Sequence, residues 1–557
     1  MLLDEASEVL EMFKHSFPLS MLFFVPLLII ISPASPVSAA HDFAVYRMQQ
    51  YDLHGSAYGC RNALVNVEAR PLDTTSFTRR CLVTKLMEFT TEKYKELITQ
   101  NAGGVLILLP DNLTSLKPEE KEHVMELEQE LLQEESHLPV YFTPETDELL
   151  ELYHGLKHSI NSDQAGSATQ ALMKSAGANG FQLIVNGPQS KAMPDFQVVN
   201  LQGKLSGYGI EEQLPTVAIV AHYDAFGIAP SLSFGSDSNG SGVVALLEMA
   251  RLFSKLYTSS RTHAKYNMLF LLSGAGKYNY QGTRRWIEDQ LDSSENSLLS
   301  DVSYVLCVDA IGNGDSLYLH VSKPPKPGSA GHTFYENLVE VASELSPGTT
   351  VAQVHKKINL AEDYLSWEHE RFSMRRLPAF TLSHLESQRY MARNTILDTR
   401  DNVDTKVLTK NVQLITEALA RQIFNLNNSG TPQVFVEGLR VESQVVESWM
   451  DYLGSTPRSA QLLDKNSAVV NTLEHGLSRY LKDVQRHVFR SDKRDPEFVF
   501  YNGATYQMSA YSVKPAVFDL FLALGISSYL AIVFLVAQIM PRHHMFGYEE
   551  RLSHEGN

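Results

Sequence analysis

Several side chains that can bind a metal ion stand where apolar segments of the chain end. His222 and Asp224 follow directly after the apolar run Val217 to Ala221, Asp309 follows a later apolar run, and His369 lies in a charged segment beyond. Neutral imidazole and carboxylate groups are ligands that Zn²⁺ accepts. Chemistry in open α/β sheets gathers where strands end, so this pattern favours a metal site at the edge of a sheet. His-x-Asp also has a structural explanation, because the two side chains can cap a strand and bond to each other.

The elements that must position these side chains are runs in which apolar and polar residues do not alternate. Such runs predict strands that are buried on both faces, as in a parallel sheet covered by helices. They are residues 217–221, 267–272, 302–308 and 379–382. A turn rich in Gly, Ser and Asn follows the first run and leads into a predicted helix at residues 242–257. The sequence therefore predicts an α/β domain with its site residues at strand ends.

The order and spacing of these residues resemble family M28, the co-catalytic di-zinc aminopeptidases, with the glutaminyl cyclases as relatives. In the pattern of that family, His222 matches the first metal ligand and Asp224 the carboxylate that orients it. Asp309 matches the later aspartate ligand, and His369 matches the last histidine ligand. The resemblance implies an M28 aminopeptidase-like fold, which is a mostly parallel sheet flanked by helices.

The chain also departs from the family pattern at positions that the chemistry needs. Residues 235–242 match a block whose metal-bridging aspartate falls on Ser238, and the glutamate pair of the family falls on Gly276 and Lys277. A serine hydroxyl brings no charge to hold two cations close together. An ammonium group has no lone pair and repels a cation. The glutamate that is missing at Gly276 would have taken the proton from the attacking water.

These losses favour a protein without catalytic residues, bound metal or cofactor. His222, Asp309 and His369 remain, and one weak mononuclear metal site built from them is the alternative. We interpret the matching positions as relics of a metal site that now bond to protein groups: His222, Asp224, Ser238, Gly276, Lys277, Asp309 and His369. We also expect the Lys277 ammonium to occupy the vacated position and to pair with Asp309 or Asp224, because an unpaired buried carboxylate is costly.

Over nearly its whole length the chain resembles the nicalins, a family of nicastrin-like membrane proteins of the endoplasmic reticulum. The resemblance runs from the N-terminal apolar segment through the degenerate M28-like domain to a C-terminal apolar segment. It implies a non-catalytic subunit that assembles with Nodal modulator and a small multipass membrane protein. It further implies work with the ribosome-associated translocon on multipass membrane proteins, and the family has been linked to Nodal signalling.

Two apolar segments lie toward the ends of the chain. Residues 17–31 lead into small residues that suit signal-peptidase cleavage after Ala40, and retention of this segment as a membrane anchor is the alternative. Residues 516–540 carry no formal charge from Leu520 onward and are long enough to span a bilayer. Together they predict a single-pass type I membrane protein whose main part is lumenal.

The length of 557 residues predicts more than one domain. We expect a signal peptide (1–40), an N-terminal lumenal α/β region (41–159), the M28-like domain (160–430), a membrane-proximal stalk (431–515), a transmembrane helix (516–540) and a cytosolic tail (541–557). In the stalk, Tyr501 to Ala504 predict a two-residue hairpin turn. The net charge of −17 argues against nucleic-acid binding, because no basic stripe neutralises phosphates.

Further signals agree with a secretory compartment. Three triplets are acceptors for N-glycosylation, at Asn112, Asn239 and Asn427. Cys60 and Cys81 could pair in an oxidising lumen, whereas Cys307 lies in a predicted strand and is expected to be a buried free thiol. With the family resemblance, these features predict a glycoprotein of the endoplasmic reticulum membrane.

Two other functions remain open from the sequence. The main rival is an active zinc aminopeptidase or a glutaminyl-cyclase-like enzyme with remodelled ligands, and Ser238, Gly276 and Lys277 argue against it. The other is a metal-free module that binds peptide termini in the cleft where the active site of an M28 enzyme would lie.

Overall fold

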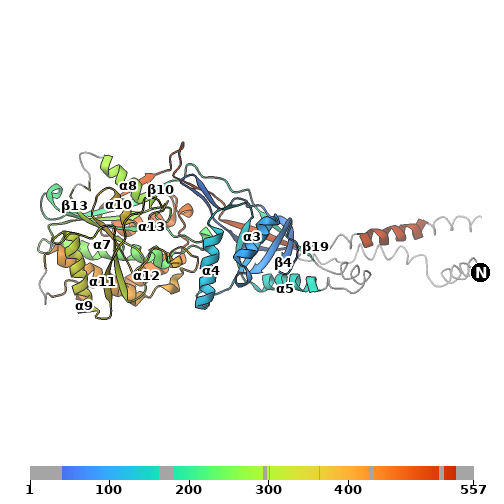
Figure 1. The fold of residues 1–557 in the computed structure, drawn as a ribbon, viewed down its shortest axis with the longest axis horizontal. Coiled ribbons are helices and arrows are strands. Elements are labelled where there is room, and N and C mark those ends of the chain that lie inside the picture. Colours follow the sequence, from blue (N-terminus) through green and yellow to red (C-terminus); the bar gives the residue numbers. More distant parts are fainter. Residues whose placement is uncertain are drawn as a thin grey trace, which may run out of the picture.

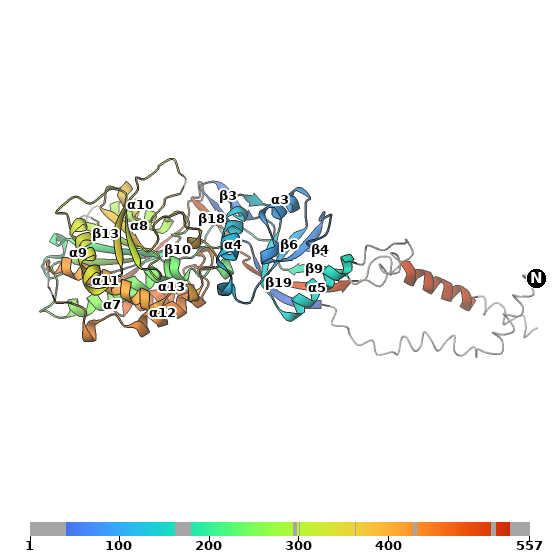
Figure 2. The same ribbon diagram turned by 60° about the horizontal axis from the view of Figure 1, so that its bottom comes forward.

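The computed structural model of the chain describes residues 40–161, 180–292, 298–299, 301–362, 364–426, 432–513 and 520–534. These residues form two domains, here called the sheet domain and the barrel domain, which follow one another along the long axis (Figure 1). A helix at residues 520–534 projects from the barrel domain on the side away from the sheet domain (Figure 2). Residues 1–39 of the predicted signal peptide, the sequon at Asn427 and the cytosolic tail lie outside the described residues.

The sheet domain is built on an eight-stranded sheet with the order β15-β14-β16-β13-β11-β12-β10-β17. Its central strands pair in parallel, as the apolar runs predicted: β11 (Thr216–His222), β12 (Asn267–Ser273), β13 (Val302–Val308) and β16 (Ala379–Ser383). Three outer strands add antiparallel pairs, so the sheet is mixed: β10 (Val198–Leu205), β14 (Ser316–Val321) and β17 (Lys482–Phe489). The edge strand β15 (Thr350–His355) pairs in parallel with β14.

Helices cover both faces of this sheet, which explains why β11 shows no alternation of apolar and polar residues. Val217 and Ile219 pack into the larger core beneath one helical layer, whereas Ala218 and Val220 face the other layer. The larger layer contains α7 (Gly242–Thr258), α9 (Ala330–Leu345), α11 (Thr405–Ile423), α12 (Ser443–Ser455) and α13 (Ala468–Ser478). The opposite layer contains α8 (Gln281–Asp292) and α10 (His369–Met374).

The barrel domain contains a closed barrel with the strand order β1-β19-β9-β4-β5-β6-β8. Its strands are β1 (Ala40–Arg47), β4 (Asn66–Pro71), β5 (Arg80–Lys85), β6 (Gly104–Leu109), β8 (Val140–Pro144), β9 (Gly180–Asn186) and β19 (Thr505–Val513). Three helices accompany it: α3 (Thr91–Thr99), α4 (Pro118–Leu131) and α5 (Asp147–Asn161). A smaller four-stranded sheet has the order β18-β2-β3-β7, with β18 at Phe498–Phe500, β2 at Gln50–Leu53, β3 at Ser56–Cys60 and β7 at Glu135–Ser136.

The predicted stalk at residues 431–515 is wrong, because this segment is shared between both domains. Helices α12 and α13 bury their apolar faces in the main core of the sheet domain, and β17 pairs with β10 at the edge of its sheet. Strand β19 closes the barrel between β1 and β9. The stretch reads as amphipathic because it covers apolar surface of the two domains. The boundary predicted at residue 160 is also wrong, since β9 belongs to the barrel.

The hairpin predicted at Tyr501 to Ala504 is wrong for a related reason. Strand β18 (Phe498–Phe500) pairs with β2 (Gln50–Leu53), whereas β19 pairs with β1 and β9. The turn therefore passes the chain from one sheet to another, and its residue types fit both kinds of connection.

The predicted disulfide is absent from the described structure. Cys60 and Cys81 are both buried free thiols, and the Cys60 Sγ donates to the backbone oxygen of Asn62 at 2.9 Å. Burial raises the pKa of the Cys81 thiol to about 12, which keeps it protonated and unreactive. Cys307 is a buried free thiol in β13, as predicted.

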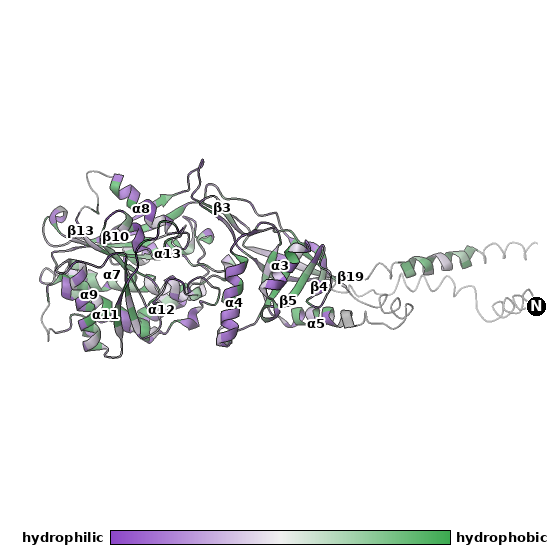
Figure 3. Cartoon of the chain, viewed as in Figure 1, coloured by the Kyte–Doolittle hydropathy of each residue, from purple (hydrophilic) through white to green (hydrophobic). Residues whose placement is uncertain are grey.

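Apolar side chains dominate the helix at residues 520–534 (Figure 3). Many of them are exposed in the isolated chain: Leu520, Phe521, Leu522, Leu524, Ile526, Leu530, Ile532 and Phe534. Within the described part of the chain, no helix is both long enough and apolar enough to cross a membrane.

Candidate functional site

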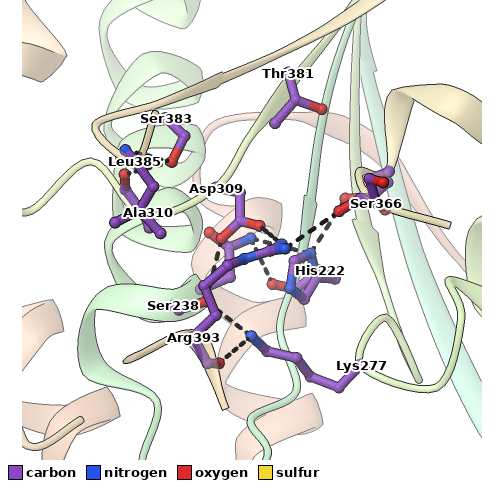
Figure 4. A network of polar contacts seen from close by, with 12 residues as sticks. His222, Ser238, Lys277, Asp309, Ala310, Ser366, Thr381, Ser383, Leu385 and Arg393 are labelled. Atoms are coloured by element: carbon purple, nitrogen blue, oxygen red, sulfur yellow. Dashed lines mark hydrogen bonds and ion pairs between the residues drawn. The ribbon is translucent and has the colours of Figure 1, made fainter. Parts of the chain in front are cut away.

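The parallel strands bring the predicted site residues to one edge of the sheet. His222 ends β11 and lies opposite Ser273, the last residue of β12. Asp309 directly follows β13, whose Cys307 pairs with Val220 of β11. We call the polar group at these strand ends the strand-end cluster; it consists of His222, Asp224, Ser238, Lys277, Asp309, Glu368 and Arg393. Figure 4 shows its centre.

Arg393 occupies the position beside Asp309 and was not found from the sequence. Its Nη2 pairs with the Asp309 Oδ2, and the two side chains are 9% and 3% exposed. The guanidinium lies 4.2 Å from the ring centre of Trp367 and donates to the Ser366 oxygen at 3.2 Å. Burial is the largest single influence and would raise the pKa of Asp309, but the neighbouring cationic groups, with Arg393 the strongest of them, together outweigh it and hold that pKa well below its ordinary value. Asp309 is therefore a charged carboxylate with a protein cation as its partner.

Lys277 also reaches the strand-end cluster, as predicted, but its ammonium group bonds to other partners than the prediction gave. Its Nζ donates to the Ser238 Oγ at 2.8 Å and to the Arg393 backbone oxygen at 2.7 Å. The Ser238 hydroxyl in turn donates to the Asp309 Oδ1 at 3.3 Å. No direct ion pair joins Lys277 to Asp309 or Asp224 among the described ion pairs, because Arg393 already holds Asp309; the predicted pairing is wrong. Burial lowers the pKa of Lys277 to about 8, against the opposing charge of Asp309.

Asp224 is satisfied by backbone groups. Its Oδ1 accepts the Gly276 N–H at 2.6 Å, and its Oδ2 accepts the Lys277 N–H at 3.0 Å. Gly276 leaves no space for the glutamate of the family pattern, because a Cβ there would lie 2.3 Å from the Cβ of His222. The loop after β12 therefore folds against the histidine ring in a way that excludes a side chain at position 276.

His222 bonds to Glu368, another residue that was not singled out as part of the site. Its Nδ1 lies 3.3 Å from the Glu368 Oε2. The other oxygen of Glu368 accepts the hydroxyls of Ser273 at 2.6 Å and Thr283 at 2.5 Å. The His222 Nε2 is buried without a hydrogen-bond partner among the described residues. A sequence signal for Glu368 existed, because the M28 pattern has an aspartate directly before the last histidine ligand, and Glu368 stands at that position before His369.

His369 does not join the strand-end cluster. It begins α10, and its Nδ1 lies 2.9 Å from the Thr381 Oγ1 while its Nε2 lies 3.0 Å from the Ser322 Oγ. Burial, with the nearby His320, lowers the pKa of His369 to about 3, so the ring is neutral and acts as a structural hydrogen-bonding group. His369, which matches the last histidine ligand of the family pattern, therefore bonds to groups outside the strand-end cluster.

The loop that carries Ser238 is held by groups from distant parts of the chain. The Asp398 carboxylate accepts the backbone N–H groups of Asp237 and Ser238, both at 2.9 Å. Buried Arg458 donates to the backbone oxygens of Phe234 at 2.9 Å and Gly235 at 2.6 Å. Neither Asp398 nor Arg458 had a sequence signal, because both come from loops that only the fold brings here.

The sequon at Asn239 is incompatible with this folded arrangement. Asn239 is fully buried, and its Nδ2 donates to the His222 backbone oxygen at 2.9 Å. A glycan on that nitrogen would have to lie inside the sheet domain. Asn112 is exposed next to the short turn that it caps, so its side chain can carry a glycan.

A zinc ion does not fit the residues of the strand-end cluster. Zn²⁺ needs several anionic or neutral donors, and here two protein cations, Arg393 and Lys277, already bond to the groups around Asp309. Ser238 replaces the bridging carboxylate and is itself bonded to Lys277. Among the described residues, no three His, Cys, Asp or Glu side chains gather in a way that could hold a metal ion.

The fold and this cluster define a peptidase-like protein of the M28 class, with Ser238 and Lys277 at two positions where the family pattern has metal ligands. The model of "Peptidase family M28" matches residues 200–419, which cover most of the sheet domain. The crystal structure of the γ-secretase component nicastrin superposes with a TM-score of 0.60 at 12% identity, covering 84% of this chain and 99% of that chain. This likeness shows that both domains share the nicastrin-like mixed α/β fold.

Relatives with higher sequence identity show the family to which the chain belongs. The chain is 52% identical over 96% of its length to the BOS complex subunit ncln of Danio rerio, of which it also covers 96%. It is 52% identical to the human BOS complex subunit NCLN, covering 96% of this chain and 97% of that relative. It is 32% identical to the nicalin of Caenorhabditis elegans, covering 95% and 96%. The chain belongs to the nicalin family, a degenerate branch of the M28 peptidases.

Proposed function

We propose that this protein is a non-catalytic scaffold subunit of a membrane complex of the BOS type. The observation that carries the proposal is the identity of 52% over nearly the whole chain to relatives that are named as subunits of that complex. The strand-end cluster supports it, because the position of the catalytic metals is taken by an Arg393–Asp309 ion pair and by Lys277. Such a site can hold a fold together, and it lacks the carboxylates that the family pattern places at Ser238, Gly276 and Lys277 to bridge metals and activate water.

A single-pass type I arrangement in the endoplasmic reticulum membrane belongs to this proposal. The exposed apolar helix at residues 520–534 supports it, since such a surface is stable when covered by lipid or by apolar helices. Strand β19 ends at Val513 just before that helix, and Ala40, the first described residue, pairs with Tyr511 near the end of β19. Residues 40 and 513 thus lie at the same end of the barrel domain, next to the start of the apolar helix, which supports a lumenal placement of the main domains.

The partners follow from the family and are part of the proposal. They are Nodal modulator and a small multipass membrane protein, at the ribosome-associated translocon, where the complex supports the biogenesis of multipass membrane proteins. A role in Nodal signalling would be a consequence of the same assembly. The apolar helix at residues 520–534 is the element that suits contact with another membrane protein.

The test is purification of the full chain from membranes in mild detergent, with partners and bound zinc measured on the same sample. A chain that ends at Val513 serves as the matched control, because it keeps every strand of the barrel and lacks the apolar helix. We expect a multipass membrane protein to co-purify with the full chain and not with the control. Recovery of the full chain alone, with stoichiometric zinc and aminopeptidase turnover, would instead support the enzyme.

A further inference from the structure

The two domains meet at a buried carboxyl group on helix α4. Glu128 is 3% exposed, and its Oε1 accepts the backbone N–H of Ile228 at 3.1 Å and of Ile396 at 3.0 Å. Helix α4 belongs to the barrel domain, whereas both donors belong to loops of the sheet domain. One oxygen atom therefore joins the barrel domain to two separate loops of its neighbour.

Those loops are the ones that flank the strand-end cluster. The Ile228 loop follows β11 and carries Asp224, and the Ile396 loop carries Arg393 and Asp398. Apolar contacts accompany the hydrogen bonds, because Ile228 and Ile396 pack into the core of the barrel domain. Displacement of α4 would remove these contacts from both loops together, and one of the loops carries the arginine that pairs with Asp309.

The second oxygen of Glu128 makes the contact sensitive to protons. Oε2 is buried without a hydrogen-bond partner among the described residues. Burial raises the pKa of Glu128 to about 7, against the opposing effect of the two N–H groups that donate to Oε1. Charged groups on the neighbouring elements are engaged elsewhere: Lys95 with Glu130, Glu88 with Lys157, His123 with the Phe89 oxygen, Arg393 with Asp309, and Asp398 with the Ser238 N–H.

We propose that Glu128 is a proton-linked clamp that docks the barrel domain onto the loops of the strand-end cluster, and that docking is tighter when its carboxyl group is protonated. The direction of the pH effect follows from the thermodynamic linkage between proton binding and docking. Undocking exposes Glu128 to water, where its pKa returns to an ordinary value near 4.5, so the docked state binds the proton more strongly. Between about pH 6 and about pH 8 the docking equilibrium should weaken roughly tenfold. This inference concerns the chain alone and does not require any partner.

Hydrogen exchange of the purified full chain tests the clamp, because the Ile228 and Ile396 amides are the donors. After correction for the intrinsic exchange rate, we expect their protection to fall about tenfold between about pH 6 and about pH 8. Glu128→Gln keeps an acceptor oxygen and cannot ionise, so its protection should be the same at both pH values. Glu126→Gln, an exposed position on the same helix, should behave like the wild type.

Two outcomes would overturn the clamp. One is a wild-type protection profile that is flat across this pH range. The other is the same pH dependence in Glu128→Gln, which would place the titrating group elsewhere. If Glu128→Gln does not fold, the wild-type profile still decides, because the clamp requires a midpoint near pH 7.

Discussion

Arg393 pairs with Asp309 across 84 residues of sequence and fills the centre of the strand-end cluster. In an M28 enzyme a metal ion would supply the positive charge that Asp309 faces. Here a guanidinium supplies it, and Trp367 and Ser366 hold that guanidinium in place. The cluster is therefore a structural ion pair whose removal should destabilise the sheet domain.

Arg393→Met leaves Asp309 buried and charged without its ion-pair partner. Removal of one member of a buried pair typically costs about 3–5 kcal/mol. We expect a large fall in the unfolding temperature of the variant, and a smaller fall when Asp309→Asn is added, because the second change removes the unpaired charge. Arg389→Met, in the same loop but exposed, is the control. Strict additivity of the two changes would show that the residues do not act as a pair.

Gly276→Ala should destabilise the fold although alanine is small. Its Cβ would lie 2.3 Å from the Cβ of His222, which requires a shift of the loop after β12. Overpacking of this kind costs about 1–3 kcal/mol. Denaturant unfolding measures the effect, and Gly438→Ala is a matched control because its Cβ would meet nothing within 4 Å. Equal stability of the two variants would mean that the loop is not packed as described.

The neutral state of His369 predicts a pH dependence of stability. Its pKa is lowered from an ordinary 6.5 to about 3, so the unfolded chain binds a proton that the folded chain does not. Stability should be complete above about pH 6.5 and should decrease as the pH falls from there toward about 3. His369→Gln should reduce the slope of stability against pH, whereas the exposed His137→Gln should not. An unchanged slope would assign the effect to other groups.

Glycosylation should occur at Asn112 and not at Asn239. Asn112 is exposed, whereas Asn239 is fully buried with its Nδ2 bonded to the backbone of His222. Treatment of microsomes with peptide N-glycosidase should lower the apparent mass of the wild type. Asn112→Gln should remove one glycan from the protein, and an Asn239→Gln chain that still folds should keep the wild-type number. Loss of a glycan in Asn239→Gln would place that loop on the surface.

The central strands could be predicted from the sequence, whereas the side chains that bond to the site residues mostly could not. β11, β12, β13 and β16 were predicted because burial on both faces leaves uninterrupted apolar runs, and their parallel order put His222 and Asp309 together. Arg393, Asp398 and Arg458 were not predicted, because loops carry them and no local pattern records which strand end a loop will reach. Their positions follow from tertiary contacts alone.

The wrongly predicted stalk at residues 431–515 shows a second limit of prediction from the sequence. An amphipathic segment indicates that it covers an apolar surface, but it does not indicate which one. Helix α13 covers the main core of the sheet domain, and β19 completes a barrel that begins at Ala40, more than 450 residues earlier in the chain (Asp42 and Ser509 bond across 467 residues). Strand pairings of such long range have no local signature, so the domain boundaries could not be found.

Arg393 and Lys277 stand in the strand-end cluster where the M28 pattern places metal ions. Elemental analysis of the full chain, purified from membranes in mild detergent without a chelator, measures whether zinc is bound there. We expect zinc far below stoichiometric amounts, with the same low value in His222→Ala. Stoichiometric zinc in the wild type that is lost in His222→Ala and in Asp309→Asn would contradict this replacement of metal by protein cations. In that case Asp309 and His222 would bind a metal ion instead of bonding to Arg393 and Glu368.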